Sequence, residues 1–210
     1  MLASLTPNAV AGDSMSEKND VNISSAMNVQ DLQVLFADLQ PQLIRGSRTV
    51  APEALSSAAA ALAKVARILG IPMTFAVVPV AGQPGQLIPE LAEFAMPETT
   101  FGRMVTSPFL EPRIVARLAA SHRKTLVIAG FTTEVAVLQS ALDGIAAGYA
   151  VQVPLDAIGS RSERTESPAI RQIEMAGGST SSVLSLVTRW APDLSRPPGS
   201  EIIKALDALR

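Results

Sequence analysis

Three polar features of this chain could carry out chemistry, because each lies in or directly after a segment with the pattern of a strand. Asp38 closes the run LQVLFAD, and Arg103 lies in the weaker strand candidate TTFGRMV. The corner FTTEVA follows the run TLVIAG and leads directly into an amphipathic segment. A strand, a sharp polar corner and a helix start are how a parallel-sheet enzyme presents a reactive side chain.

Alanine occupies the position in this corner that is best placed for a nucleophile. Ala136 carries only a methyl group, which has no lone pair with which to attack a carbonyl carbon. The corner is therefore either a catalytic turn without its nucleophile or a turn that never carried one.

Each polar feature also has a purely structural interpretation. Asp38 could cap a helix, Arg103 could pair with a surface carboxylate, and Thr133 could be a helix N-cap. Taken singly, these interpretations are preferred. In a parallel sheet, however, the three features should meet at the carboxyl ends of the strands, where α/β proteins form their binding sites. Their joint placement favours a functional site.

The order of apolar runs and amphipathic segments indicates alternating strands and helices. This alternation predicts a three-layer α/β/α sandwich with a central, mostly parallel six-stranded sheet. Strands are predicted within residues 32–38, 71–80, 99–105, 125–130, 149–157 and at the start of 179–191. Helices are predicted within residues 52–70, 81–91, 110–124, 133–148, 162–178, 179–191 and 199–210.

Composition restricts the classes of function. With 210 residues, 48% of them apolar and 17% charged, the chain fits one globular domain at residues 28–210, preceded by a flexible tail at residues 1–27. The formal net charge of −2 offers no basic field for nucleic acid or an anionic membrane. No segment has the ~18 consecutive apolar residues of a membrane span, and the start lacks a secretory pattern, so a cytoplasmic protein is expected.

No cofactor or metal ion is expected. The chain has no cysteine, which excludes disulfides and zinc–thiolate sites. The single histidine, His122, is predicted to lie in a surface loop, and metal-ligand spacing does not accompany it.

Several segments resemble motifs of the isochorismatase-like superfamily, also called the cysteine hydrolase superfamily. FADLQ is similar to its first-strand motif, IAGFTTEVAV to its signature, and ALDGIAAGYAVQVPLDAIGSRS to the helix, strand and Asp-Ala turn that follow. The resemblance extends from Asn28 to the C-terminus. The loop GQPGQLIPEL, followed by Arg103 in place of lysine, is most similar to the YcaC-like branch. That branch implies a small-molecule substrate and a homo-oligomer, specifically an octamer.

The resemblance implies a role for each candidate residue. It assigns Asp38 as the catalytic acid and base, Arg103 as the organising cation and Ala136 as the position of the nucleophilic cysteine. The main-chain amides of Thr132 and Ala136 are the expected oxyanion donors, next to a cis peptide bond between Phe131 and Thr132. The candidates for substrate contact are Gln40, Phe101, Phe109 and Phe131. The Asp-x-His zinc motif of family nicotinamidases is missing, which disfavours that activity.

The resemblance also predicts an ancestral activity, hydrolysis of the carbon–nitrogen bond of a small amide through a covalent acyl-enzyme. Without the cysteine, the chain is expected to be inactive or severely impaired in that reaction. Ala136 could be an engineered Cys-to-Ala change, or it could mark a natural binding or scaffold protein. It is also compatible with vinyl-ether cleavage, as in isochorismatases that use the first-strand aspartate as proton donor. Arg103 counts against this last alternative, because those enzymes keep the lysine.

Overall fold

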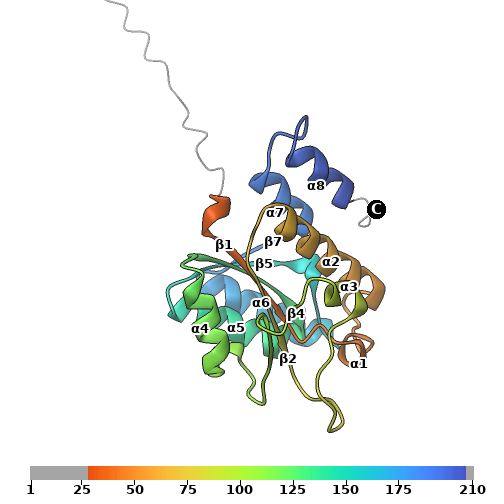
Figure 1. Cartoon of the computed structure of the whole chain (residues 1–210). Helices are drawn as coiled ribbons and strands as arrows, with labels where there is room; N and C mark the ends of the chain where they lie inside the picture. Colours follow the sequence, from red (N-terminus) through yellow and green to blue (C-terminus); the bar gives the residue numbers. More distant parts are fainter. Residues whose placement is uncertain (1–27, 207–210) are drawn as a thin grey trace, which may run out of the picture.

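Parallel strands form one sheet at the centre of the molecule (Figure 1). The computed structural model describes residues 28–206. Six strands cross the sheet in the order β3-β2-β1-β4-β5-β7, and the two-residue β6 pairs with β4. The predicted six-stranded sheet is thus confirmed, with β6 as an addition and with every pairing parallel. The strands are β1 Leu32–Ala37, β2 Met73–Val77, β3 Thr100–Gly102, β4 Thr125–Phe131, β5 Ala150–Pro154, β6 Ile158–Gly159 and β7 Ser179–Ser181.

Helices cover both faces of the sheet, as the predicted sandwich requires. Helices α2, α3, α7 and α8 bury apolar residues in one core cluster, and α4, α5 and α6 do so in the other. Figure 1 shows these two groups on opposite sides of the strands. The helices are α1 Pro41–Ile44, α2 Pro52–Ile68, α3 Pro89–Ala92, α4 Pro112–Ala120, α5 Leu138–Ala146, α6 Glu163–Met175, α7 Val183–Trp190 and α8 Gly199–Ala205.

Strand β1 shows why a sheet covered on both faces needs a nearly continuous apolar run. Val34 and Phe36 belong to the core cluster under α2, whereas Leu35 belongs to the cluster under α5. Successive side chains of a strand point to opposite faces, so both sets must be apolar when helices cover both sides. All six residues of β1 are buried, and Asp38 follows immediately at the carboxyl edge of the sheet.

The connection from β4 to α5 brings the polar corner to the same edge. Gly130 is required near the end of β4, because a Cβ there would lie 2.6 Å from the main-chain oxygen of Ala37. The sequence predicts a helix from Thr133 onward, but a π-helical turn at Thr133–Val137 precedes α5. Single π-helical turns are rare and frequently lie at functional sites. Gly148, with a φ of +89°, follows the end of α5 as the predicted stop.

The predicted flexible tail at residues 1–27 lies outside the described residues. Within residues 28–206, none of the helices combines the length and the apolar character that a membrane span requires.

Candidate active site

Asp38 lies directly after β1, at the carboxyl edge of the sheet. Its main-chain N–H donates to the carbonyl oxygen of Ala76 at 2.9 Å, which continues the pairing of β1 with β2. Its backbone has a φ of +58°, a left-handed conformation that aspartate tolerates better than most residues. The carboxylate does not cap a helix, so the capping interpretation of Asp38 is wrong. Asp38 is 7% exposed, and its carboxylate faces Arg103.

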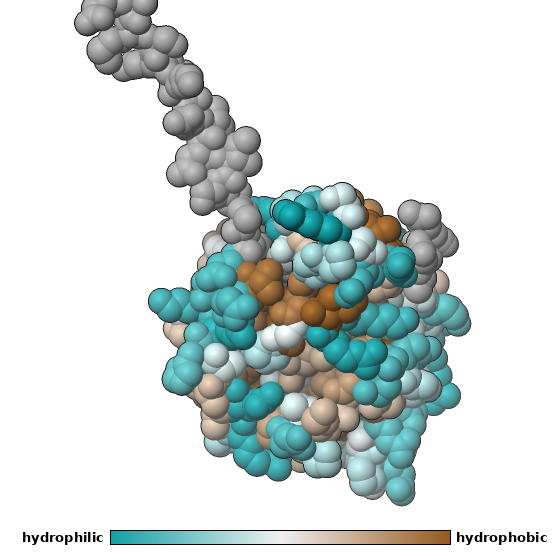
Figure 2. Space-filling view, turned by 45° about the horizontal axis from the view of Figure 1, so that its top comes forward, coloured by the Kyte–Doolittle hydropathy of each residue, from teal (hydrophilic) through white to brown (hydrophobic). Residues whose placement is uncertain are grey.

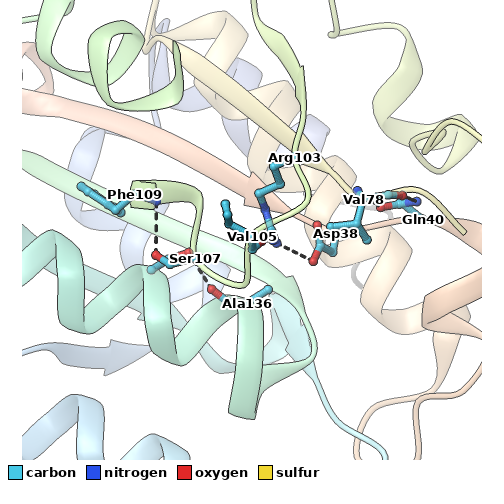
Figure 3. Close-up of polar contacts among 9 residues, drawn as sticks. Asp38, Gln40, Val78, Arg103, Val105, Ser107, Phe109 and Ala136 are labelled. Atoms are coloured by element: carbon cyan, nitrogen blue, oxygen red, sulfur yellow. Dashed lines mark hydrogen bonds and ion pairs between the residues drawn. The ribbon is translucent and has the colours of Figure 1, made fainter. Parts of the chain in front are cut away.

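Arg103 lies one residue after β3 and turns inward. Its Nη2 atom donates to Oδ2 of Asp38 at 2.6 Å, and its Nη1 atom donates to the main-chain oxygen of Val105. Figure 3 shows the guanidinium and the carboxylate pointing toward each other across the ends of the strands. Because Arg103 is only 3% exposed, it is not the surface ion-pair partner that its sequence context also allowed.

Burial and the ion pair act in opposite directions on the pKa of Asp38. Desolvation raises the pKa of Asp38 from its ordinary 3.8 to about 6, and the charge and hydrogen bond of Arg103 oppose this only in part. Burial also disfavours the charged form of Arg103, which lowers the pKa of Arg103, although Asp38 opposes this shift. The other oxygen of Asp38, Oδ1, and the Nε atom of Arg103 are buried without a hydrogen-bond partner in the described structure.

The polar corner ends beside this ion pair. The peptide bond between Phe131 and Thr132 is cis. Ala136 lies within the π-helical turn, and its carbonyl oxygen accepts a hydrogen bond of 2.6 Å from the hydroxyl of Ser140. The methyl group of Ala136 is buried, and Figure 3 shows it at the start of the helix, near the ion pair.

A cavity of about 540 Å³ joins the ion pair to the corner. This volume lies in the range of pockets that hold small molecules. Five predicted site residues line the cavity together: Asp38, Arg103, Phe131, Thr132 and Ala136. The full lining also includes Leu43, Val78, Pro79, Met104, Val105, Thr106, Glu134, Val135 and Arg161. Most of the walls are apolar, and Asp38, Arg103, Glu134 and Arg161 are the charged residues among them.

The isochorismatase-domain family model matches residues 32–184, a segment that contains the ion pair, the corner and the cavity lining. The chain belongs to the isochorismatase family. This result confirms the resemblance seen in the sequence motifs.

Individual relatives place this isochorismatase-family chain near YcaC. The probable hydrolase YcaC of Escherichia coli (strain K12) is 31% identical over 157 residues, which cover 72% of this chain and 73% of YcaC. The secreted isochorismatase effector Isc1 of Phytophthora sojae is 28% identical over 191 residues, which cover 87% of this chain and 84% of Isc1. The solved structure of Escherichia coli YcaC, described as an octameric hydrolase of unknown specificity, superimposes on this chain with a TM-score of 0.80. The match covers 87% of this chain and 89% of the YcaC chain, at 24% sequence identity. The YcaC-like branch is therefore confirmed.

Three residues predicted to contact the substrate lie outside the cavity of this isochorismatase domain. Gln40 is fully buried, and its side-chain amide accepts from the N–H of Val78 at 2.8 Å and donates to the Val78 carbonyl at 2.9 Å. Phe109 packs edge-on against Tyr149, with ring centroids 6.0 Å apart, and Phe101 packs against the core cluster under α5. Figure 3 shows Phe109 on the far side of Ser107 from Asp38. These side chains support the backbone and the core.

A hydrogen-bond network behind the corner was not predicted from the sequence. Glu166 accepts from the hydroxyls of Thr133 at 2.8 Å and Thr49 at 3.0 Å. Because its hydroxyl is directed at Glu166, Thr133 does not act as an N-cap, and that interpretation is wrong. Glu134, which lines the cavity, accepts from the hydroxyl of Ser160 at 2.6 Å. The density of hydroxyls and carboxylates in FTTEVA and GSRSERTE is the signal for this network.

No role was predicted for Arg161, which lies between β6 and α6 and lines the cavity. Elsewhere, His122 lies in an exposed position after α4, as expected for a surface loop. Among residues 28–206, no group of three or more His, Cys, Asp and Glu side chains could hold a metal ion.

Proposed function

We propose that this chain binds a small amide or related carbonyl compound in the cavity beside Asp38 and Arg103, and that its ancestral activity was hydrolysis of the carbon–nitrogen bond. The observation that carries this proposal is the buried ion pair of Asp38 and Arg103 on the wall of the cavity that Ala136 also lines. A buried pair with unsatisfied polar atoms costs stability, so its position at a cavity is better explained by a ligand than by folding.

The roles follow from the resemblance to cysteine hydrolases. Asp38 would take the proton of the thiol and return it to the leaving amine, and Arg103 would hold the carboxylate in place. The main-chain amides of Thr132 and Ala136 would bind the oxyanion that develops on the substrate carbonyl. The missing part is the sulfur. Because the methyl group of Ala136 cannot attack a carbonyl carbon, we propose that the chain is inactive or severely impaired in acyl transfer, whether Ala136 is engineered or natural.

Restoring the thiol tests this proposal. The variant Ala136→Cys should gain hydrolysis of at least one member of a panel of small amides, measured as released ammonia. The double variant Asp38→Asn/Ala136→Cys should lose that activity, because it keeps the thiol and removes the base. Absence of turnover in Ala136→Cys would favour the alternative, a binding or scaffold protein whose site has changed at more than one residue.

A second candidate function is vinyl-ether cleavage, and the pKa of Asp38 favours it. A carboxyl group with a pKa of about 6 can donate a proton near neutral pH, and this reaction needs no thiol. The arginine at position 103 counts against it. Turnover of isochorismate by the unmodified chain, abolished in Asp38→Asn, would select this candidate over the amide proposal.

We also propose an oligomeric state and a cellular location for this chain. Escherichia coli YcaC is octameric, and a closed homo-oligomer, specifically an octamer, is proposed here by homology. A cytoplasmic location without nucleic-acid or membrane partners stays a prediction from composition and charge.

A further inference from the structure

Arg161 brings a second guanidinium to the cavity, and we propose that it recognises a carboxylate on the ligand. This inference rests on the proposed function, because it assumes that the cavity holds a small carbonyl compound. Arg161 lines the same cavity as Asp38 and Arg103, and its side chain is exposed to solvent. No acidic side chain within residues 28–206 forms an ion pair with it. Arg103 differs, because Asp38 already balances its charge.

The main chain on both sides of Arg161 is firmly held. The N–H of Ser160 donates to the hydroxyl of Thr49 at 2.8 Å, and its carbonyl oxygen accepts from the N–H of Arg48 at 2.7 Å. On the other side, Ser162 is the N-cap of α6 and accepts from the N–H of Arg164 at 3.2 Å. A cation on a fixed backbone loses less conformational freedom when it binds an anion than one on a loose loop.

The guanidinium also has a defined neighbour. A Cβ built on Gly46 would lie 3.5 Å from Cζ of Arg161, so the guanidinium packs over the main chain at Gly46. Glu134, which also lines the cavity, accepts from the hydroxyls of Ser160 at 2.6 Å and Thr165 at 3.3 Å. Among the described residues Glu134 forms no ion pair with Arg161, so the guanidinium donors of Arg161 stay available for a ligand.

The remaining lining residues of the cavity indicate what kind of ligand would fit between the charged groups. Apart from the ion pair and Arg161, the cavity is lined mainly by apolar side chains, among them Leu43, Val78, Pro79, Val105, Phe131 and Val135. The matching compound has a carbonyl group for Asp38 and Arg103, an apolar body, and a carboxylate for Arg161. Arginine suits this task, because its planar donors can hold a carboxylate with two parallel hydrogen bonds.

The experiment compares two compounds of the same shape by isothermal titration calorimetry of the unmodified protein. Terephthalamate carries one carboxamide and one carboxylate on a benzene ring, and terephthalamide is its neutral diamide. Succinamate and succinamide form a shorter pair.

Within at least one pair the anion should bind about tenfold more tightly, and the preference should shrink with added salt. Arg161→Gln should remove the preference, and Arg161→Lys should keep part of it. Arg164→Gln removes an exposed cation outside the cavity lining and should leave the preference for the anion unchanged.

Equal affinity for anion and diamide in the unmodified protein would overturn the proposal, as would a preference that survives Arg161→Gln. Failure of all four compounds to bind would overturn it too. The proposed function is judged separately by alkylation of Ala136→Cys with iodoacetamide, which is neutral and does not need Arg161. Rapid alkylation without any anion preference would remove the role of Arg161 alone, whereas slow alkylation would remove the proposed function.

Discussion

Asp38 combines a left-handed backbone, burial and an ion pair with Arg103, and each of these affects its chemistry. The backbone conformation turns its carboxylate across the ends of the strands toward Arg103. Burial makes the charged form costly, so its pKa rises even though a guanidinium lies 2.6 Å away. A carboxyl group that titrates near neutral pH is suited to taking and returning a proton. The sequence alone suggested the residue and its partner, but the pKa depends on burial by loops.

The raised pKa predicts how stability depends on pH. The folded protein holds the proton of Asp38 more tightly than the unfolded chain, so this contribution is largest below about pH 4 and is lost as the pH rises through about 6. The free energy of unfolding, measured relative to that of Asp38→Asn, should fall by on the order of 2–3 kcal/mol between about pH 4 and about pH 7. Denaturant titrations of both proteins at matched pH measure it. Parallel profiles would contradict the assigned pKa.

At the scale of elements, the close approach of β4 to β1 sets the position of the corner. A methyl group at Gly130 would lie 2.6 Å from the Ala37 carbonyl and 3.1 Å from Val137 in the π-helical turn. Gly130→Ala should therefore lower the free energy of unfolding by about 1–3 kcal/mol. Gly102→Ala is the matched control, since a Cβ at Gly102 meets nothing within 4 Å. It should change stability by less than about 0.5 kcal/mol. Equal losses in the two variants would show that strand contact is not the cause.

For the molecule as a whole, the surface supports the proposed assembly. Apolar side chains are exposed beside the cavity, with Met104 at 85% and Val135 at 44%. Figure 2 shows hydrophobic residues gathered in a patch on the face in view. Contiguous apolar surface of this kind marks contacts between proteins. Light scattering should give the mass of a closed homo-oligomer, with eight copies expected from YcaC. A monomer at micromolar concentration would contradict the proposed assembly.

The parallel sheet explains why much of the site, but not all of it, could be predicted from the sequence. Alternating apolar runs predict parallel strands, and parallel strands bring their carboxyl ends together, which is why Asp38, Arg103 and Ala136 could be placed at one site. The roles of Gln40 and Phe109 depend on where loops turn their side chains, which no local pattern specifies. Thr133 of the π-helical turn donates to Glu166 of α6, a tertiary contact that no local sequence pattern specifies.

The most direct measurement is the rate at which iodoacetamide alkylates the thiol of Ala136→Cys. The new thiol would lie at the start of a helix near Arg103, and both features lower the pKa of a cysteine. We expect alkylation at least about tenfold faster than that of a free thiol at neutral pH, with slower reaction in Asp38→Asn/Ala136→Cys. Ala136→Ser should gain no comparable reactivity, and the unmodified chain should not react. A thiol in Ala136→Cys that reacts no faster than free cysteine would contradict the claim that only the nucleophile is missing.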